Sequence, residues 1–180
     1  MTFRIATASD IPALQQLIAD SVRGLSADYY TPAQIDASLI EVFGVDTQLI
    51  EDETYYVMDG TNGPAAAGGW SGRRTLFGGS HMKQSDDPRL DPATEPARIR
   101  AFFVHPDYAR RGLARELYNT CARAAYSAGF RTFELMATMP GRPLYNALGF
   151  VEVEHVQLPM TNNETLPLTR MRRVIEPERA

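Results

Sequence analysis

The residues with the clearest chemical potential lie where an apolar segment meets a basic turn near the middle of the chain. The segment Ile99 to Val104 has the composition of a buried strand, and Pro106 behind it cannot extend a central sheet ladder. A helix is expected to open within the turn, which consists of Arg110, Arg111, Gly112, Leu113, Ala114 and Arg115. The first amides of a helix have no partner within it and carry the positive end of its dipole. Small and basic residues at this place therefore favour phosphate binding.

Two common phosphate-binding patterns are absent from this turn. No Gly-Lys-Ser/Thr follows the glycine, which excludes a Walker A loop, and no Gly-x-Gly-x-x-Gly is present, which excludes the dinucleotide fingerprint. Many helices also begin with glycine and arginine for solubility alone. The turn by itself therefore leaves phosphate binding and a purely structural role open.

A second motif, later in the chain, bears on this choice. Tyr145 is followed by Leu148-Gly149-Phe150, and both come after Val104-His105-Pro106 and the turn Arg110 to Ala114. With these motifs in this order, the sequence resembles the Gcn5-related N-acetyltransferase (GNAT) superfamily. In that family a strand ending in Val-x-Pro leads to an Arg/Gln-x-x-Gly-x-Gly/Ala turn that holds the coenzyme A pyrophosphate, and a later tyrosine precedes Leu-Gly-Phe. Ala109 departs from the first turn position, which removes one side-chain contact and leaves the amides in place.

The resemblance implies acetyl-CoA as co-substrate and no metal, and it carries roles over to individual residues. The pyrophosphate would rest on the amides of Arg110 to Arg115. Tyr145 would be the general acid, because a phenol with an ordinary pKa of about 10 stays protonated and can supply a proton to a thiolate. A tyrosine packed on a short helix is the alternative. Asn146 either touches the coenzyme or faces solvent. The backbone implicated in pairing with the pantetheine arm is that of Phe102, Phe103 and Val104.

The general base is not evident from the sequence. Members of the resembled family often carry a glutamate in the central strand, at the place where this chain has Arg98. Glu95, Glu134, His81 or a water molecule are the candidates that remain. The three histidines show no spacing typical of a metal site. No cysteine or serine nucleophile with a paired histidine is evident, so direct attack on the thioester is expected.

Composition and charge exclude several classes of protein. The chain has 180 residues, of which 44% are hydrophobic and 22% charged, as in a globular protein that buries a core. A net charge of −4 argues against non-specific binding to nucleic acid. No apolar run approaches membrane length and no signal-peptide pattern is seen, so a cytoplasmic protein without a membrane partner is expected. Cys121, the only cysteine, is expected to be an inert core thiol.

The elements that must position these residues follow from hydrophobic periodicity and from glycine and proline. Strands are expected at Thr2–Ala6, Thr54–Met58, Ala65–Leu76, Ile99–Val104, Thr132–Ala137, Phe150–Leu158 and Leu166–Val174. Helices are expected from Ser9 or Asp10 to Gly24, from Thr31-Pro32 onward, from the basic turn to Ala128, and over Pro143–Leu148. Gly68 and Gly69 would weaken a lone strand, which indicates a neighbour or a ligand close against them.

These elements predict a fold of the α/β (α+β) class. A helix connects the strands Ile99–Val104 and Thr132–Ala137, which makes this central pair parallel. The resemblance implies the GNAT fold, a mixed, mostly antiparallel twisted sheet of about six to seven strands, with its central parallel pair splayed at the coenzyme site and about four helices around it. A single domain is expected over residues 1–175, with a long loop at 80–96 before the central strand and a frayed tail at 176–180.

The predicted function is acetyl-CoA-dependent N-acetyl transfer to a primary amine of a small molecule by direct attack. Two alternatives stay open. One is a sensor that binds acyl-CoA without transferring the acyl group, which the missing strand glutamate permits. The other is an acetyltransferase that acts on a peptide or protein amine. Self-association into a homodimer, through an exposed sheet edge or the last hairpin, is a further prediction.

Overall fold

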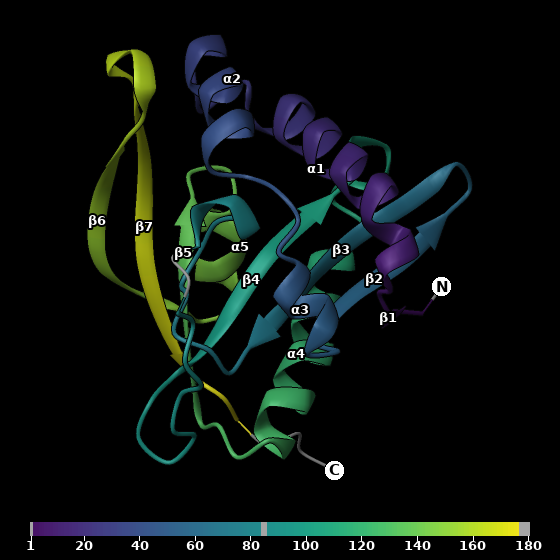
Figure 1. The fold of residues 1–180 in the computed structure, drawn as a ribbon, viewed down its shortest axis with the longest axis vertical. Coiled ribbons are helices and arrows are strands. Elements are labelled where there is room, and N and C mark those ends of the chain that lie inside the picture. Colours follow the sequence, from purple (N-terminus) through teal and green to yellow (C-terminus); the bar gives the residue numbers. More distant parts are fainter. Residues whose placement is uncertain (1, 84–85, 177–180) are drawn as a thin grey trace.

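The computed structural model describes residues 2–83 and 86–176, which form a mixed β-sheet with helices on both faces (Figure 1). The described strands are β1 (Arg4–Ile5), β2 (Tyr55–Gly60), β3 (Gly63–Ser71), β4 (Ala97–Val104), β5 (Thr132–Thr138), β6 (Val151–Pro159) and β7 (Thr165–Val174). They form a seven-stranded sheet in the order β1-β2-β3-β4-β5-β7-β6. β4 and β5 run parallel, and the other neighbouring strands are antiparallel. The predicted mixed sheet with a central parallel pair is confirmed.

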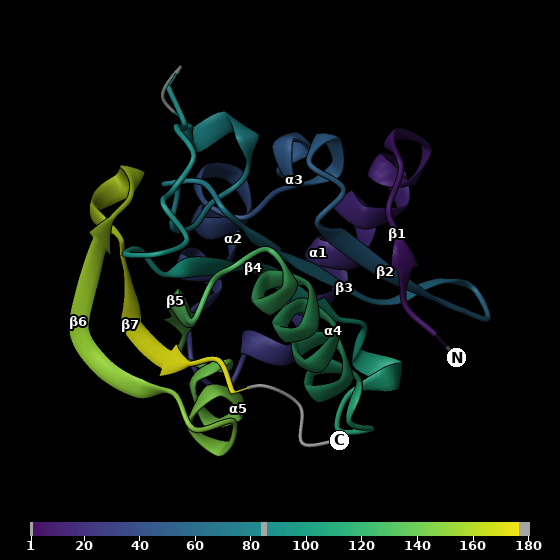
Figure 2. The same ribbon diagram turned by 90° about the horizontal axis from the view of Figure 1, so that it is seen from below.

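Five α-helices are present among the described residues, one more than predicted. They are α1 (Ile11–Ser26), α2 (Pro32–Glu41), α3 (Thr47–Glu51), α4 (Leu113–Ser127) and α5 (Arg142–Ala147). The additional helix, α3, is too short to show hydrophobic periodicity. Helices α1, α2 and α3 lie on one face of the sheet, the α1 face, and helices α4 and α5 lie on the other, the α4 face (Figure 2).

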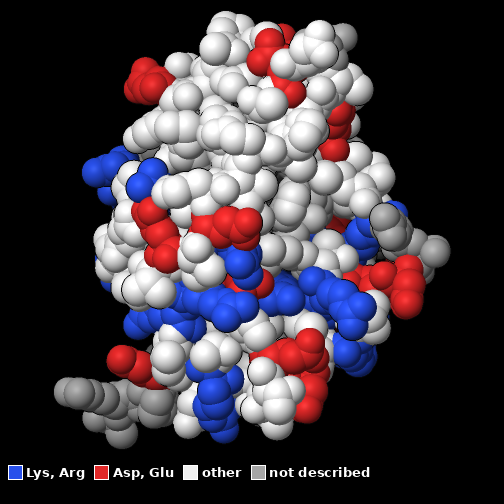
Figure 3. All heavy atoms as spheres, turned by 90° about the vertical axis from the view of Figure 1, so that its left-hand side faces the viewer, with Lys and Arg blue, Asp and Glu red and all other residues white. Residues whose placement is uncertain are grey.

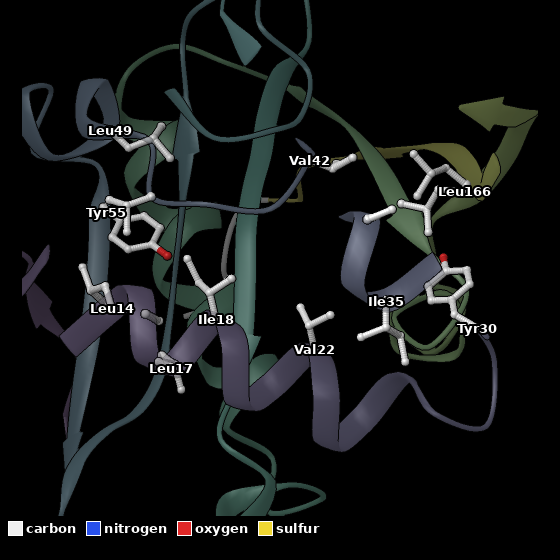
Figure 4. Close-up of a cluster of buried hydrophobic side chains, with 14 of the residues drawn as sticks. Leu14, Leu17, Ile18, Val22, Tyr30, Ile35, Val42, Leu49, Tyr55 and Leu166 are labelled. Carbon is white, nitrogen blue, oxygen red and sulfur yellow. The ribbon is translucent and has the colours of Figure 1, made fainter. Parts of the chain in front are cut away.

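Each face of the sheet carries its own apolar core. On the α1 face, four buried residues recur every three or four positions along α1 and point toward the sheet and Tyr55 (Figure 4). They are Leu14, Leu17, Ile18 and Val22. Burial of each such side chain contributes roughly 1.5–3 kcal/mol. On the α4 face, Leu117, Cys121 and Ala125 of α4 are fully buried, which confirms Cys121 as a core thiol. The sheet is therefore a rigid frame between two packed layers.

The sheet opens between its two central strands. Only two residue pairs join β4 and β5, Ala97 with Phe133 and Arg98 with Glu134, although both strands continue beyond them. Further along β4, Ala101 has a φ of 53°, and the register with β3 shifts opposite it. A bulge of this kind bends a strand and increases its twist. The C-terminal halves of β4 and β5 therefore diverge and enclose a gap.

Two glycines of β3 allow neighbouring groups to come close. A Cβ built on Gly68 would lie 2.4 Å from a ring carbon of Phe102, and one built on Gly69 would lie 2.2 Å from the carbonyl oxygen of Thr54. The close neighbours predicted from this glycine pair are therefore atoms of the chain itself.

Two strands are shorter than predicted. β1 is confined to Arg4–Ile5, and β3 ends at Ser71 instead of Leu76. At the end of β3 the Ser71 hydroxyl accepts a hydrogen bond from the Arg73 amide at 3.0 Å. Such a local side-chain bond offers the backbone an alternative to the sheet ladder.

The predicted loop at 80–96 is tied to the rest of the structure in its described part. The Lys83 Nζ atom lies 2.8 Å from a carboxylate oxygen of Asp46 and 2.8 Å from one of Asp87. Residues 177–180 of the predicted tail lie outside the described residues. Across the described helices, none combines the length and the apolar character that a membrane span requires.

Candidate active site

A cavity of about 600 Å³ occupies the gap between β4 and β5. Its lining includes Gly112, Ala114 and Tyr145 on the α4 face, and Phe43 and Phe77 on the α1 face. The cavity therefore connects the two faces through the sheet. Small-molecule sites commonly have volumes of about 300–1,000 Å³. Two ligands that approach from opposite faces can meet in this gap.

The start of α4 is open toward the cavity. Gly112 precedes the helix with a φ of 85°, and no side chain caps the helix there. The amides of Gly112, Leu113 and Ala114 donate no hydrogen bond within the described part of the chain. A Cβ built on Gly112 would meet no atom within 4 Å. Three amides without partners, next to open space at the positive end of a helix, make a site for an anion such as phosphate.

This site is shorter than the predicted series of amides. Helix α4 begins at Leu113, within the predicted turn but not at its first residue, because the positive φ of 63° at Arg110 is incompatible with a helix. The prediction also needs correction at Arg115, whose amide donates to the Gly112 carbonyl oxygen at 3.0 Å and is therefore not free. Arg110 and Arg115 nevertheless line the cavity and place positive charge beside the free amides.

Three residues that were expected at the coenzyme lie outside the cavity lining. They are Arg111, Leu113 and Asn146. The Arg111 guanidinium lies 5.3 Å from the centre of the Tyr108 ring, and Asn146 is exposed on α5. The amide of Leu113 nevertheless donates no hydrogen bond within the described part of the chain.

The end of β4 presents its backbone to the gap. Phe102, Phe103 and Val104 all line the cavity, and β4 has no partner on β5 beyond Arg98 in the described sheet. The Val104 amide donates to the Ser21 hydroxyl of α1 at 3.3 Å, a long hydrogen bond. Strand edges without a partner can pair with an extended ligand that contains amides.

Tyr145 approaches the cavity from α5 on the α4 face. It is 8% exposed and packs edge-on against Phe150, with ring centres 5.5 Å apart, and beside Phe102, with ring centres 6.4 Å apart. Burial raises the pKa of its phenol above the ordinary value, so the hydroxyl stays protonated at physiological pH. The hydroxyl makes no hydrogen bond within the described part of the chain. It is therefore available as a donor to a ligand in the cavity.

Glu134 of β5, one candidate base, belongs to an ion cluster next to the cavity. Its carboxylate lies 3.1 Å from Arg98 and 3.4 Å from Arg170, and it also pairs with Arg172. Lysine and arginine side chains gather in a band across the side of the molecule that carries β6 and β7 (Figure 3). The carboxylate of Glu134 is therefore already engaged by three guanidinium groups.

Glu95 and His81, the other two candidate bases, do not line the cavity. A carboxylate oxygen of Glu95 accepts a hydrogen bond from the Asp91 amide at 2.8 Å and stabilises the turn before β4. His81 packs against Gly44 and lines a separate groove beside α1. No Asp, Glu or His is among the described residues that line the cavity. Of the four predicted proton acceptors, a water molecule is therefore the one that remains a candidate.

Arg100 was not predicted as part of the site, although it lines the cavity. It is 1% exposed and donates to Asp46 at 2.8 Å and to the carbonyl oxygens of Gly78 at 2.7 Å and Thr75 at 3.1 Å. These bonds hold the segment after β3 and the start of α3 against β4, and so position the cavity wall on the α1 face. In the sequence, this role of Arg100 was indicated only by the presence of an arginine within an otherwise apolar strand.

Comparisons with known proteins agree with this geometry. A model of the acetyltransferase (GNAT) family matches residues 20–150. The fold resembles that of a GCN5-related N-acetyltransferase from Rhodopseudomonas palustris, with a TM-score of 0.69, 17% identity, and coverage of 96% of this chain and 94% of that chain. It also resembles the structure of yncA from Salmonella typhimurium, which was solved with acetyl-CoA. Here the TM-score is 0.63, the identity is 16%, and the match covers 99% of this chain and 96% of that chain. For the ribosomal-protein-S18-alanine N-acetyltransferase from Escherichia coli, the TM-score is 0.60, the identity is 16%, and the match covers 99% of this chain and 96% of that chain.

The family model and the solved structures carry different weight. At these identities the solved structures show the fold alone, and a comparison with curated proteins finds no match. The family model, in contrast, spans most of the chain, from α1 to the end of the segment that contains Tyr145. The chain therefore belongs to the acetyltransferase (GNAT) family.

Proposed function

We propose that the protein is an acetyl-CoA-dependent N-acetyltransferase that moves an acetyl group to a primary amine of a small molecule by direct attack. The observation that carries this proposal is the cavity through the sheet, with the open start of α4 at one end. Family membership supports acetyl transfer. The similar fold of the Salmonella typhimurium structure, solved with acetyl-CoA, supports acetyl-CoA as the donor.

The α4 face suits the coenzyme. The free amides at the start of α4 would hold the pyrophosphate, with Arg110 and Arg115 adding charge beside them. The pantetheine arm would enter the gap and pair with the free edge of β4. This route brings the thioester next to Tyr145, which lies on the same side of the gap.

The chain's own groups can supply what acetyl transfer requires. The amine nitrogen bonds to the carbonyl carbon, the carbon–sulfur bond breaks, and one proton passes from nitrogen to sulfur. Because the phenol of Tyr145 is protonated and has no hydrogen-bond partner among the described residues, it can donate to the leaving thiolate. A backbone amide at the end of β4 can donate a hydrogen bond to the carbonyl oxygen.

Two measurements test the proposal. Acetyl-CoA is expected to raise the melting temperature of the protein, because a ligand that binds only the folded state stabilises it. Release of free thiol is then followed with acetyl-CoA across a panel of amines. Absence of both stabilisation and thiol release would contradict the proposal.

A sensor that binds acyl-CoA without transfer is the second candidate. It is favoured by the lack of Asp, Glu and His among the described lining residues. Acetyl-CoA binding without thiol release, unaffected by Tyr145→Phe, would support it.

The predicted cytoplasmic location, the homodimer and the domain limits stay predictions. Size-exclusion chromatography with light scattering tests the homodimer.

A further inference from the structure

The end of the cavity on the α1 face is apolar and is assembled from separate segments. Phe43, which follows α2, packs edge-on against Phe103 of β4, with ring centres 6.0 Å apart and ring planes at 79°. Walls of this kind favour an aromatic or aliphatic group over a hydrated one. The side chains that form this end are those of Leu25, Tyr29, Phe43, Phe77, Met136 and Leu168.

The charged residues of the cavity are all basic. Among the described lining residues these are Arg100, Arg110 and Arg115, and none is acidic. Arg110 and Arg115 lie at the coenzyme end, and Arg100 is already paired with Asp46 at 2.8 Å. An ammonium group on the acceptor would lose its water there and find no carboxylate. Burial of a charge without a partner is strongly unfavourable, so a cationic acceptor is disfavoured.

Among the described residues that line the cavity there is also no Asp, Glu or His that could deprotonate an ammonium group. An alkylamine resembles the lysine side chain, whose pKa is about 10.4, and is almost entirely protonated at neutral pH. An arylamine is neutral at that pH, because its lone pair is delocalised into the ring. Its attack on a thioester needs no prior deprotonation, and its N–H proton can pass to the sulfur during the transfer.

We infer that the acceptor is an arylamine, a primary amine attached directly to an aromatic ring, with no positively charged group elsewhere in the molecule. This inference rests on the proposed function and narrows it to one class of substrate. The ring lies between Phe43 and Phe77 at the α1 end, and the amine faces the gap where the thioester arrives.

Thiol release from acetyl-CoA with three acceptors tests this inference. The acceptors are aniline, 2-phenylethylamine, which is aromatic but strongly basic, and spermidine, which is a polycation. At pH 7 we expect the highest kcat/KM for aniline, and a value for spermidine that is lower by about 100-fold or more. Between pH 7 and 9 the rate with 2-phenylethylamine should rise about tenfold per pH unit with its neutral fraction, while that with aniline stays constant. A higher kcat/KM at pH 7 for either other amine would overturn the inference.

A change of specificity at one residue tests the charge argument. Phe77→Glu places a carboxylate in the wall, and Phe77→Gln is the uncharged variant of matched size. We expect the ratio of kcat/KM for spermidine to that for aniline to rise about tenfold in Phe77→Glu only, through the new ion pair. An equal change in both variants, or none in either, would contradict the charge argument.

Thermal stabilisation by acetyl-CoA is measured in the same experiments. It distinguishes a failure of the arylamine assignment from a failure of the proposed acetyltransferase function. Stabilisation together with preferred turnover of spermidine would leave the proposed function intact and overturn only the arylamine assignment. Absence of both stabilisation and turnover would overturn the two together.

Discussion

The two ends of the cavity are built in different ways. The end on the α4 face, the proposed coenzyme end, presents backbone amides of one continuous turn, Gly112 to Ala114, with two arginines beside them. The end on the α1 face, the proposed acceptor end, presents apolar side chains from α1, from the segments after α2 and β3, and from β5 and β7. One end therefore depends on the conformation of a short turn, and the other on the packing of segments that are distant in the sequence.

The two ends differ in how strongly their binding properties depend on the identity of individual side chains. Amides at a helix start recognise phosphate whatever the neighbouring side chains are, so many sequences can preserve such a site. A wall of side chains changes its shape and charge with single substitutions. We therefore expect mutations at the acceptor end to change stability or specificity, and mutations at the coenzyme end to change coenzyme affinity or turnover.

The largest effect on stability is expected at the acceptor end. Asp46→Asn leaves the buried guanidinium of Arg100 without its counter-ion, and we expect the free energy of unfolding to fall by about 3–5 kcal/mol. Arg100→Met should cost less, because Asp46 keeps Lys83 Nζ at 2.8 Å. Urea unfolding followed by circular dichroism measures both variants. Equal losses in the two would contradict this account of the ion pair.

The largest effect on turnover is expected at Tyr145. Tyr145→Phe removes the proposed proton donor, and we expect kcat to fall by about 100-fold, with the Kd for acetyl-CoA unchanged. Tyr126→Phe, on α4 outside the cavity lining, is the matched control and should keep wild-type kcat. If both variants turn over at the wild-type rate, Tyr145 is a packing residue.

A smaller effect is expected for charge at the coenzyme end. Arg115→Gln removes one cation next to the free amides, and we expect the Kd for acetyl-CoA to rise about tenfold at low salt, since charge-assisted bonds to phosphate are strong but partly screened. Arg89→Gln is the control, because its side chain is 71% exposed and pairs with Asp52. Isothermal titration at two salt concentrations measures both. A change in acceptor KM alone would place Arg115 at the wrong end of the cavity.

A further expected effect is a pH dependence of stability that arises from Tyr30 in the core of the α1 face. The Tyr30 hydroxyl donates to the Pro167 carbonyl oxygen at 2.7 Å and accepts from the Met139 amide at 2.8 Å. Burial raises its pKa to about 12. Above pH 10 or so the unfolded chain loses a proton that the folded chain keeps, so stability falls between about pH 10 and 12, by up to about 1.4 kcal/mol per pH unit.

The Tyr30→Phe variant isolates this contribution. It should lose stability at pH 7, because the Met139 amide loses its acceptor, but its stability should decline less steeply between about pH 10 and 12. Urea unfolding at a series of pH values gives both slopes. Identical slopes for wild type and variant would show that Tyr30 does not titrate as proposed.

The sheet and the turn that precedes α4 could be predicted from sequence because their determinants are local. Gly112, the flanking arginines and the Tyr145 motif each lie within a few residues, and hydrophobic periodicity located the strands that hold them. The order of β4, α4 and β5 fixed the parallel pair through the crossover rule. The start of α4 could be predicted only to within the turn from Arg110 to Ala114, because backbone conformations such as the positive φ of Arg110 are not evident in residue types.

The acceptor end could not be predicted because it exists only in the folded structure. Phe43 and Phe77 are far apart in the sequence, and nothing in either segment indicates that the two meet across one cavity. The same holds for the pair of Arg100 and Asp46, which brings those segments together. Glu134 was considered as a base because it lies on the neighbouring strand, but its arginine partners come from β4 and β7.

The most direct test compares the same substitution at two glycines. Gly112 and Gly149 both have a φ of 85°, so alanine at either place is strained by a similar amount, roughly 1–2 kcal/mol. At Gly112 the new methyl group would project into the open space proposed for the pyrophosphate, whereas at Gly149 it would face the Arg173 guanidinium at 3.9 Å.

Isothermal titration with coenzyme A measures the coenzyme affinity of both variants, and urea unfolding measures their stability. We predict that the two variants lose similar stability, and that only Gly112→Ala binds coenzyme A about tenfold or more weakly than wild type. Equal coenzyme affinity in wild type and both variants would contradict the claim that the start of α4 holds the coenzyme.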